Sequence, residues 1–263
     1  MHSPPVILVT GASRGLGRGV ALQLAAEGCS GAINYVDNLP AAEETAALCR
    51  KASTSKRQEF LPIQANIGCG VDRTRLVVDT LWKFGHIDVL VSNAGISPRM
   101  RTDLTEATEE SFDEIVRINL RGPYFLTQAV VRHWLKDKPK PGLSGGFKII
   151  FVTSISADTA SVDRGDYCIS KAGLAMAAQL WSARLAADNI QVVEVTPGVM
   201  ATDMTSGVKG KYDRLLAGGL VPQKGWGTGK DVGLAVGAII AGRFPFSTGS
   251  VIHVDGGLHV RRL

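Results

Sequence analysis

The fold is decided near the amino terminus, where residues 6–17 read VILVTGASRGLG. The apolar start predicts a buried strand over 6–10, and the glycine-rich run leads into a helical pattern over 15–27. Glycine at positions 11, 15 and 17 permits a sharp turn and lets backbone amides and the helix N-terminus approach a pyrophosphate. Glycine turns are common, but the place of this one, at the first strand-to-helix turn, predicts dinucleotide binding.

The same alternation continues along the chain. Short runs that are apolar on both faces predict strands of a parallel sheet covered by helices, over 6–10, 32–36, 60–64, 89–92, 148–153, 192–196 and 250–254. Helical patterns lie over 15–27, 40–52, 70–84, 108–134, 166–188 and 229–242. Repeated β–α units predict an α/β fold, a Rossmann-type doubly wound parallel sheet of about seven strands with helices on both faces.

Length and composition fit a single domain over residues 1–263. The chain is 45% hydrophobic and 20% charged, which suits one large core, and no segment resembles a linker between domains. The segment 199–228 interrupts the alternation after Pro197-Gly198. Because ligands in open α/β sheets bind at the carboxyl ends of the strands, we expect this segment to close over a substrate. A plain surface excursion is the alternative.

Charge and cysteine usage bear on partners and location. The net charge is +5, but the basic residues are dispersed and do not form the stripe of a nucleic-acid binder. The four cysteines form no CxxC pair, which fits reduced thiols. The N-terminus shows no signal segment, and the apolar stretch 232–241 is too short to span a bilayer. We expect a cytoplasmic protein without nucleic-acid or membrane partners.

Two more motifs follow the glycine loop in order. Asn93-Ala94-Gly95 follows the fourth predicted strand, and Tyr167-x-x-x-Lys171 follows the fifth. With the Gly-x-x-x-Gly-x-Gly spacing of the loop, the chain resembles the short-chain dehydrogenase/reductase family over nearly its whole length, down to IHVDGG at 252–257. Within that family it looks most like the 3-oxoacyl-ACP-reductase-like enzymes. The resemblance implies an oxidoreductase of the carbonyl reductase or ketoreductase type, interconverting a ketone and a secondary alcohol by hydride transfer.

Four residues make up the predicted catalytic set. Tyr167 and Lys171 share one helix face, and a nearby ammonium stabilises a phenolate and so lowers the pKa of a tyrosine. The resemblance gives Tyr167 the role of general acid and base. It also assigns Ser154 to hydrogen-bond the substrate oxygen, and Asn119 to hold a water that links the lysine to solvent.

The resemblance also implies a nicotinamide cofactor site. Its expected residues are Gly11, Ser13, Arg14, Gly15, Leu16, Gly17, Tyr35, Asn66, Ile67, Asn93, Ala94, Gly95, Tyr167, Lys171, Pro197, Gly198, Val199 and Thr202. The resemblance places Asn66 at the adenine ring and the segment from Pro197 to Thr202 at the nicotinamide. The acid that favours NAD in this family is replaced by Tyr35, although Asp37 can still reach the ribose. Arg14 resembles the basic residue that NADP-preferring members place against the 2′-phosphate. We expect NADP(H), with NAD(H) as the alternative.

The sequence specifies the substrate less closely than it specifies the reaction. Candidate lining residues are Ser97, Arg99, Asp158, Arg164, Thr205 and Trp226. A 3-oxoacyl-ACP reductase docks an acidic carrier on basic residues; Asp188 after the Tyr167 helix argues against this, whereas the lysines at 136, 138 and 140 leave it open. A small polar ketone or a sugar-derived alcohol is the other reading.

Three further expectations concern activity, metals and assembly. A sensor or scaffold that binds NADP(H) without turnover typically lacks the tyrosine or the lysine, and this chain keeps both. No metal is expected, because the five histidines show no ligand spacing. The family resemblance implies a homo-oligomer, a homotetramer or a dimer.

Overall fold

Parallel strands form one seven-stranded sheet in the order β3-β2-β1-β4-β5-β6-β7, in a computed structural model that describes residues 3–262. The strands are β1 Val6–Val9, β2 Ser30–Tyr35, β3 Phe60–Gln64, β4 Val89–Ser92, β5 Lys148–Val152, β6 Gln191–Pro197 and β7 Val251–Val254. The strand order reverses at β1 and β4, which is the switch point where such sheets bind ligands. The predicted doubly wound parallel sheet is confirmed.

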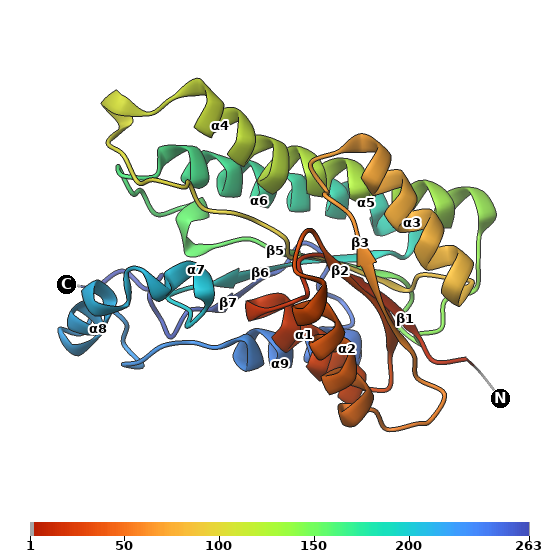
Figure 1. Ribbon diagram of the computed structural model, residues 1–263. Coiled ribbons are helices and arrows are strands. Elements are labelled where there is room, and N and C mark those ends of the chain that lie inside the picture. Colours follow the sequence, from red (N-terminus) through yellow and green to blue (C-terminus); the bar gives the residue numbers. More distant parts are fainter. Residues whose placement is uncertain (1–2, 263) are drawn as a thin grey trace.

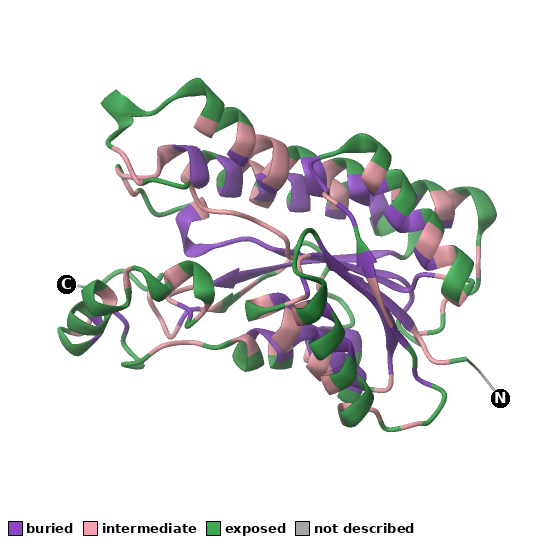
Figure 2. Ribbon diagram, in the orientation of Figure 1, coloured by how far each residue is buried: buried purple, intermediate pink, exposed green. Residues whose placement is uncertain are grey.

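Helices cover both faces of the sheet (Figure 1). One face carries α3 Gly70–Phe84, α5 Gly122–Asp137 and α6 Gly165–Leu185; the other carries α1 Gly15–Ala26, α2 Leu39–Ala52 and α9 Gly229–Ile240. The side chains of β1 alternate between two cores, because Ile7 and Val9 pack on the α1 and α9 side and Leu8 on the opposite side. Figure 2 shows that burial is concentrated in the sheet and on the inner helix faces.

The helix predicted over 108–134 contains a π-helical turn. It consists of α4 Glu109–Val116, a π-helical turn over Arg117–Arg121, and α5. π-bulges insert a residue into a helix and often lie at functional sites. Asn119 is fully buried within this turn. The predicted helix is confirmed as one helical run over 109–137, and within its π-helical turn Asn119 bonds to a neighbouring loop rather than facing solvent.

The segment 199–228 contains two short helices, α7 Asp203–Ser206 and α8 Lys209–Ala217. Figure 1 places them beside the carboxyl end of the chain and away from the layers that enclose the sheet. Most residues of α7 and α8 are exposed (Figure 2). Within residues 3–262, none of the helices has both the length and the apolar character needed to cross a membrane.

Candidate active site

The glycine loop after β1 is locked to the loop after β4. The Thr10 hydroxyl accepts the backbone N–H groups of Asn93 and Ala94, each at 3.0 Å. In return the Asn93 carboxamide donates to the carbonyls of Thr10 at 2.8 Å and Gly11 at 3.2 Å. A Cβ on Gly17 would lie 2.6 Å from the Asn93 amide nitrogen, so only glycine lets helix and loop approach this closely.

Asn34 in β2 supports the loop from the other side, and the sequence analysis missed it. Its carboxamide oxygen accepts the Gly11 N–H at 3.2 Å, and its NH₂ donates to the carbonyl of Ala65 at 3.0 Å. The side chain is 1% exposed, so these bonds form away from water. The available signal was a single amide in an otherwise small and apolar strand.

The first turn of α1 fits a dinucleotide pyrophosphate. The N-cap residue Arg14 makes no side-chain capping bond, so the first amides of the helix keep their hydrogen-bonding capacity for a ligand. Thr202, from the segment predicted to contact nicotinamide, lies against this turn, with its methyl group 3.6 Å from the Cβ position of Gly15. The loop and the Thr202 segment therefore flank one site. Gly15 has a φ of +58°, consistent with the predicted turn.

A hollow of about 300 Å³ continues from the loop and is lined by Arg14, Asp37, Asn38 and Pro40. Arg14 also lies 3.4 Å from Asp203 of α7 in an ion pair whose side chains are 59% and 71% exposed. The Arg14 guanidinium and the Asp37 carboxylate thus both line the hollow predicted to hold the adenosine ribose. Tyr35 does not line this hollow, because its side chain belongs to the buried core.

The predicted adenine-side residues lie in the turn after β3. The Asn66 carboxamide oxygen accepts the Gly68 N–H at 2.9 Å, and the Asn66 N–H donates to Asp72 at 2.8 Å. This arrangement leaves the Asn66 NH₂ available as a donor. Ile67 is buried, and its carbonyl accepts a bond from Arg73 at 2.6 Å, so its side chain serves the core.

Three of the predicted catalytic residues meet at the end of β5. Ser154 follows the strand, while Tyr167 and Lys171 lie on α6 and are both buried. The Lys171 ammonium lies 5.8 Å from the centroid of the Tyr167 ring and donates to the Val152 carbonyl at 3.1 Å. The Arg164 guanidinium lies 5.4 Å from the same ring. A phenol, a hydroxyl and two cations are therefore brought together.

Burial dominates the pKa values of this group. It raises the pKa of Tyr167 above its usual value, although a hydrogen bond from Ser154 and the charge of Arg164 lower it in part. The expectation of a lowered tyrosine pKa is thus wrong for this structure, because desolvation of the phenolate outweighs the nearby charges. Burial also lowers the pKa of Lys171 to about 8, against the charge of Glu194, which raises it.

Glu194 is a buried carboxylate in β6 that the sequence analysis did not single out. It is 5% exposed and accepts hydrogen bonds from Thr153 at 2.6 Å and Thr196 at 3.3 Å. It lies close enough to Lys171 for its charge to affect the pKa of that lysine. The signal was an acid between Val193 and Val195 in a predicted buried strand.

Asn119 joins the site through the loop after β4. Its carboxamide accepts the Ile96 N–H at 2.8 Å and donates to the Ile96 carbonyl at 2.9 Å and to the Ser170 hydroxyl at 3.2 Å. A Cβ built on Gly95 would lie 3.2 Å from the Asn119 oxygen and 3.5 Å from the Lys171 nitrogen. All four predicted catalytic residues therefore border one region, at the carboxyl edge of the sheet.

The segment after β6 is held by the last strand. The Gly198 N–H donates to the Val254 carbonyl at 3.1 Å, and the Gly227 N–H donates to the Val199 carbonyl at 2.9 Å. These bonds fix the predicted nicotinamide-contact segment at the same edge as the glycine loop.

The predicted substrate residues fall into two groups. Arg164 lies beside Tyr167, and Ser97 is half-buried in the loop after β4. The others have partners elsewhere or face solvent: Arg99 pairs with Glu114 at 2.9 Å, Thr205 donates to the Met200 carbonyl at 2.6 Å, Trp226 donates to Asp213 at 2.8 Å, and Asp158 is exposed.

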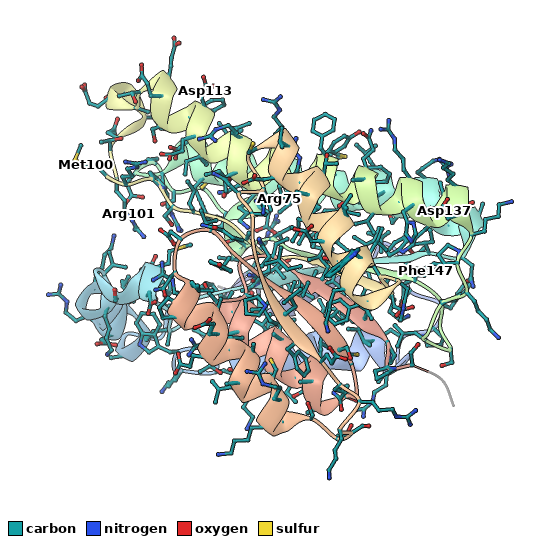
Figure 3. The ribbon with its side chains drawn as sticks, turned by 45° about the vertical axis from the view of Figure 1, so that its right-hand side comes forward. Arg75, Met100, Arg101, Asp113, Asp137 and Phe147 are labelled. Carbon is teal, nitrogen blue, oxygen red and sulfur yellow. The ribbon has the colours of Figure 1, made fainter. Side chains whose placement is uncertain are left out.

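An ion pair that was not expected from the sequence also lies at this edge. Arg101, in the loop after β4, lies 3.7 Å from Asp163, in the loop that leads into α6. Figure 3 shows Met100 and Arg101 at the end of the molecule that carries α7 and α8, with Asp137 and Phe147 at the opposite end. The contact ties together two of the loops that surround the candidate site.

Comparison with known proteins agrees with this geometry. A family model described as Enoyl-(Acyl carrier protein) reductase matches residues 11–259. The chain is 33% identical over 254 residues to the 3-oxoacyl-(acyl-carrier-protein) reductase FabG of Staphylococcus epidermidis, covering 96% of this chain and 98% of that protein. It is 30% identical over 257 residues to the 2-dehydro-3-deoxy-D-gluconate 5-dehydrogenase of Escherichia coli, covering 96% and 94%.

A solved structure matches over the full length of both chains. It is a 3-oxoacyl-(acyl-carrier protein) reductase from Brucella melitensis in complex with NAD, with 40% identity, a TM-score of 0.93 and 100% coverage on each side.

Proposed function

Since this chain belongs to the short-chain dehydrogenase/reductase family, we propose that it reduces a ketone with hydride from NADP(H) and with a proton from Tyr167. The protein is an NAD(P)-dependent oxidoreductase that acts on a small molecule. The observation that carries the proton role is the meeting of Ser154, Tyr167 and Lys171 at the carboxyl edge of the sheet. This group lies beside Gly95, and so next to the glycine loop that Asn93 locks in place.

The pKa directions favour the reductive reaction. Because the pKa of Tyr167 is raised, its phenol is protonated at neutral pH and ready to protonate a carbonyl oxygen. In our proposal Ser154 donates to the same oxygen, and the Lys171 ammonium stabilises the phenolate that remains. Nicotinamide, when bound, supplies the hydride. The role proposed for Asn119 is to hold the loop after β4 and a water beside Lys171.

The test follows NADPH absorbance against a broad panel of ketones. Tyr167→Phe should lower kcat by roughly 10²–10⁴-fold, because the proton donor is lost, and should weaken NADPH binding far less than it lowers kcat. Tyr124→Phe on α5 removes a hydroxyl outside this group and should act like the parent. Equal rates for the parent and Tyr167→Phe would refute the proton role. Tight NADPH binding without oxidation by any ketone would instead indicate a sensor or scaffold.

We propose a preference for NADP(H), with NAD(H) accepted. The support is Arg14 at the ribose hollow, where a guanidinium can meet a phosphate with two parallel bonds. Asp37 lines the same hollow and suits the ribose hydroxyl of NAD. Arg14→Ala should lower kcat/KM for NADPH by about tenfold or more and change that for NADH little. Asp37→Asn should shift the ratio the other way, and equal losses for both cofactors in Arg14→Ala would refute the phosphate contact.

For the substrate we propose a small polar ketone. Among the described residues, the Arg164 Nε is buried without a hydrogen-bond partner, which supports a polar or acidic group next to the reacting carbonyl. The second candidate is a carrier-bound 3-oxoacyl chain, favoured by the names of the relatives above. At the end of α6, however, Arg184 is neutralised by Asp188 at 2.7 Å, which weakens a basic docking face. Comparing the same 3-oxoacyl group on the carrier and on a short thioester separates the two readings.

Assembly, location and domain organisation are further proposals. Exposed apolar side chains on α5 and α6 support a homo-oligomer, a dimer or tetramer: Phe125, Ile169, Met176 and Leu180. Light scattering would test this.

Four free cysteines support a cytoplasmic location, testable by cell fractionation. We propose that residues 1–263 act as one domain in which 199–228 closes over the substrate.

A further inference from the structure

The carboxyl end of β7 turns back on itself and brings two histidines together. Gly256 and Gly257 have φ values of +63° and +86°, which favour glycine and reverse the chain after Asp255. His259 thereby returns to lie over His253, with ring centroids 3.9 Å apart and ring planes inclined by 14°. The two histidines are six positions apart in the sequence, a spacing that suggests no ligand pair unless this turn is known.

A carboxylate lies beneath the two rings. The Asp255 side chain is 2% exposed. Its carboxylate accepts hydrogen bonds from the backbone N–H groups of Gly257 and His259, each at 2.9 Å, and lies 2.7 Å from the His259 Nδ1. Burial acts to raise the pKa of Asp255, but these hydrogen bonds outweigh it and hold the pKa below its usual value. Hydrogen bonds therefore fix the buried Asp255 carboxyl group beside two accessible imidazoles.

We propose that His253, Asp255 and His259 form a binding site for a divalent transition metal of the zinc class. One donor atom from each residue lies within 4.8 Å of the other two. Two imidazole nitrogens and a carboxylate oxygen are a donor set that Zn²⁺ accepts, at bond lengths of about 2.0–2.2 Å and donor separations of roughly 3 Å. His253 is exposed and the His259 side chain is 35% exposed, so both rings can close this gap while Asp255 stays in place.

The second imidazole separates this group from an ordinary histidine–carboxylate pair. On α5, the His133 Nδ1 lies 2.8 Å from Asp137, much as His259 lies 2.7 Å from Asp255. Among the described residues, the three-donor arrangement was found at Asp255 and not at Asp137. His133 therefore provides a matched control within the same chain.

The position of the site predicts what a bound ion does. Asp255 packs behind Gly198, whose Cβ position would lie 2.6 Å from the Asp255 Cβ. The Gly256 carbonyl accepts the Gln223 N–H at 3.0 Å, and Arg262 donates to the Leu220 carbonyl at 2.9 Å. A metal at this turn would thus fasten the carboxyl-terminal segment behind the residues that border the reaction site. We assign it a stabilising role outside the hydride and proton chemistry.

The test uses the untagged full-length protein, stripped with EDTA and dialysed. Calorimetric titration with Zn²⁺ should show one ion per chain, and Zn²⁺ should raise Tm, because an ion that binds only the folded state stabilises it. His253→Gln and His259→Gln should each weaken Zn²⁺ binding by roughly 10–100-fold and remove the rise in Tm. His133→Gln should bind Zn²⁺ like the parent. Retained NADPH binding in each variant checks folding, so that a lost ion is not confused with a lost fold.

Co²⁺ gives a second readout that does not depend on stability. Co²⁺ bound to the parent protein should show visible absorption typical of nitrogen and oxygen ligands. This absorption should change in both His253→Gln and His259→Gln. The proposal is overturned if the stripped parent binds no Zn²⁺, if both variants bind it as tightly as the parent, or if His133→Gln is the variant that loses it.

Discussion

The glycine loop and residues 199–228, which we propose close over the substrate and call the closing segment, border the same edge of the sheet, but they are held in different ways. The loop is fixed by the buried Asn34 side chain of β2 on one side and by the half-buried Asn93 side chain, just after β4, on the other. The closing segment is mostly exposed, and its Thr205 bonds to its own backbone, at Met200 and Thr202. Few buried contacts allow a segment to open locally at low cost. The loop proposed to bind the cofactor is therefore built into the core, whereas the segment proposed to close over the substrate can vary without disturbing it.

The largest expected contrast comes from adding one methyl group to each region. In Gly17→Ala, the new Cβ meets the Asn93 amide at 2.6 Å and the Ala12 Cα at 2.9 Å, so the loop must shift. We expect NADPH affinity to fall about 100-fold and stability to fall by about 1–3 kcal/mol, as overpacking does. Fluorescence titration with NADPH and thermal melts measure both.

The matched change in the closing segment is Gly210→Ala. Gly210 lies in α8 with nothing within 4 Å of its Cβ position. Alanine should stabilise the helix by up to about 1 kcal/mol and leave NADPH affinity unchanged. If Gly210→Ala weakened NADPH binding as much as Gly17→Ala does, the distinction between the two regions would fail.

A second contrast removes one hydroxyl from each region. Thr10→Val leaves the half-buried Ala94 N–H without its acceptor, whereas the Asn93 N–H keeps the Val91 carbonyl at 3.1 Å, so the change should cost about 1–3 kcal/mol. Thr205→Val removes bonds within an exposed segment and should cost about 1 kcal/mol, seen mainly as a rise in KM for the ketone. Denaturant melts and steady-state kinetics separate these effects. A larger loss of stability in Thr205→Val would show that the closing segment is part of the core.

The same difference explains what the sequence could predict. The family resemblance, the sheet and the reaction class are confirmed, because strand pattern and glycine spacing follow directly from burial and backbone geometry. Asn34 and Glu194 were missed, because their roles depend on which strands become neighbours. Thr205 and Trp226 were expected to face a substrate, but both side chains hydrogen-bond to partners within 199–228. An exposed segment has no hydrophobic periodicity, so these local contacts could not be predicted from the sequence. Tyr35 was expected in the cofactor site because it takes the position of the family's acid, but its aromatic side chain packs in the core.

A smaller effect concerns pH and the buried charge behind the reaction site. The pKa of Lys171 is about 8, and the charge of Glu194 raises it. Activity that needs the ammonium should therefore fall as pH rises through about 8 in the parent, and at lower pH in Glu194→Gln. At pH 8 we expect a loss of roughly 3–10-fold, shrinking toward pH 6, where both proteins keep the ammonium.

The control for that profile is Glu59→Gln, which removes a carboxylate from the exposed pair with Lys83. It should leave the pH dependence of kcat unchanged. An identical fall with pH in Glu194→Gln and the parent would show that Glu194 does not set the protonation of Lys171, and that its bonds to Thr153 and Thr196 serve packing alone.

Among the described residues, one ion pair joins the glycine loop to the closing segment, and its removal should have the smallest effect. Arg14 and Asp203 lie 3.4 Å apart with both side chains more than half exposed, so the pair should contribute no more than about 1 kcal/mol. Asp203→Asn frees Arg14 for a phosphate, and we expect KM for NADPH to fall by less than about threefold, with the difference shrinking at high salt. Asp188→Asn breaks a comparable surface pair with Arg184 and should change nothing in cofactor binding. A tenfold change in Asp203→Asn would mean that this contact fastens the closing segment to the loop, and the two regions would then have to be treated as one unit.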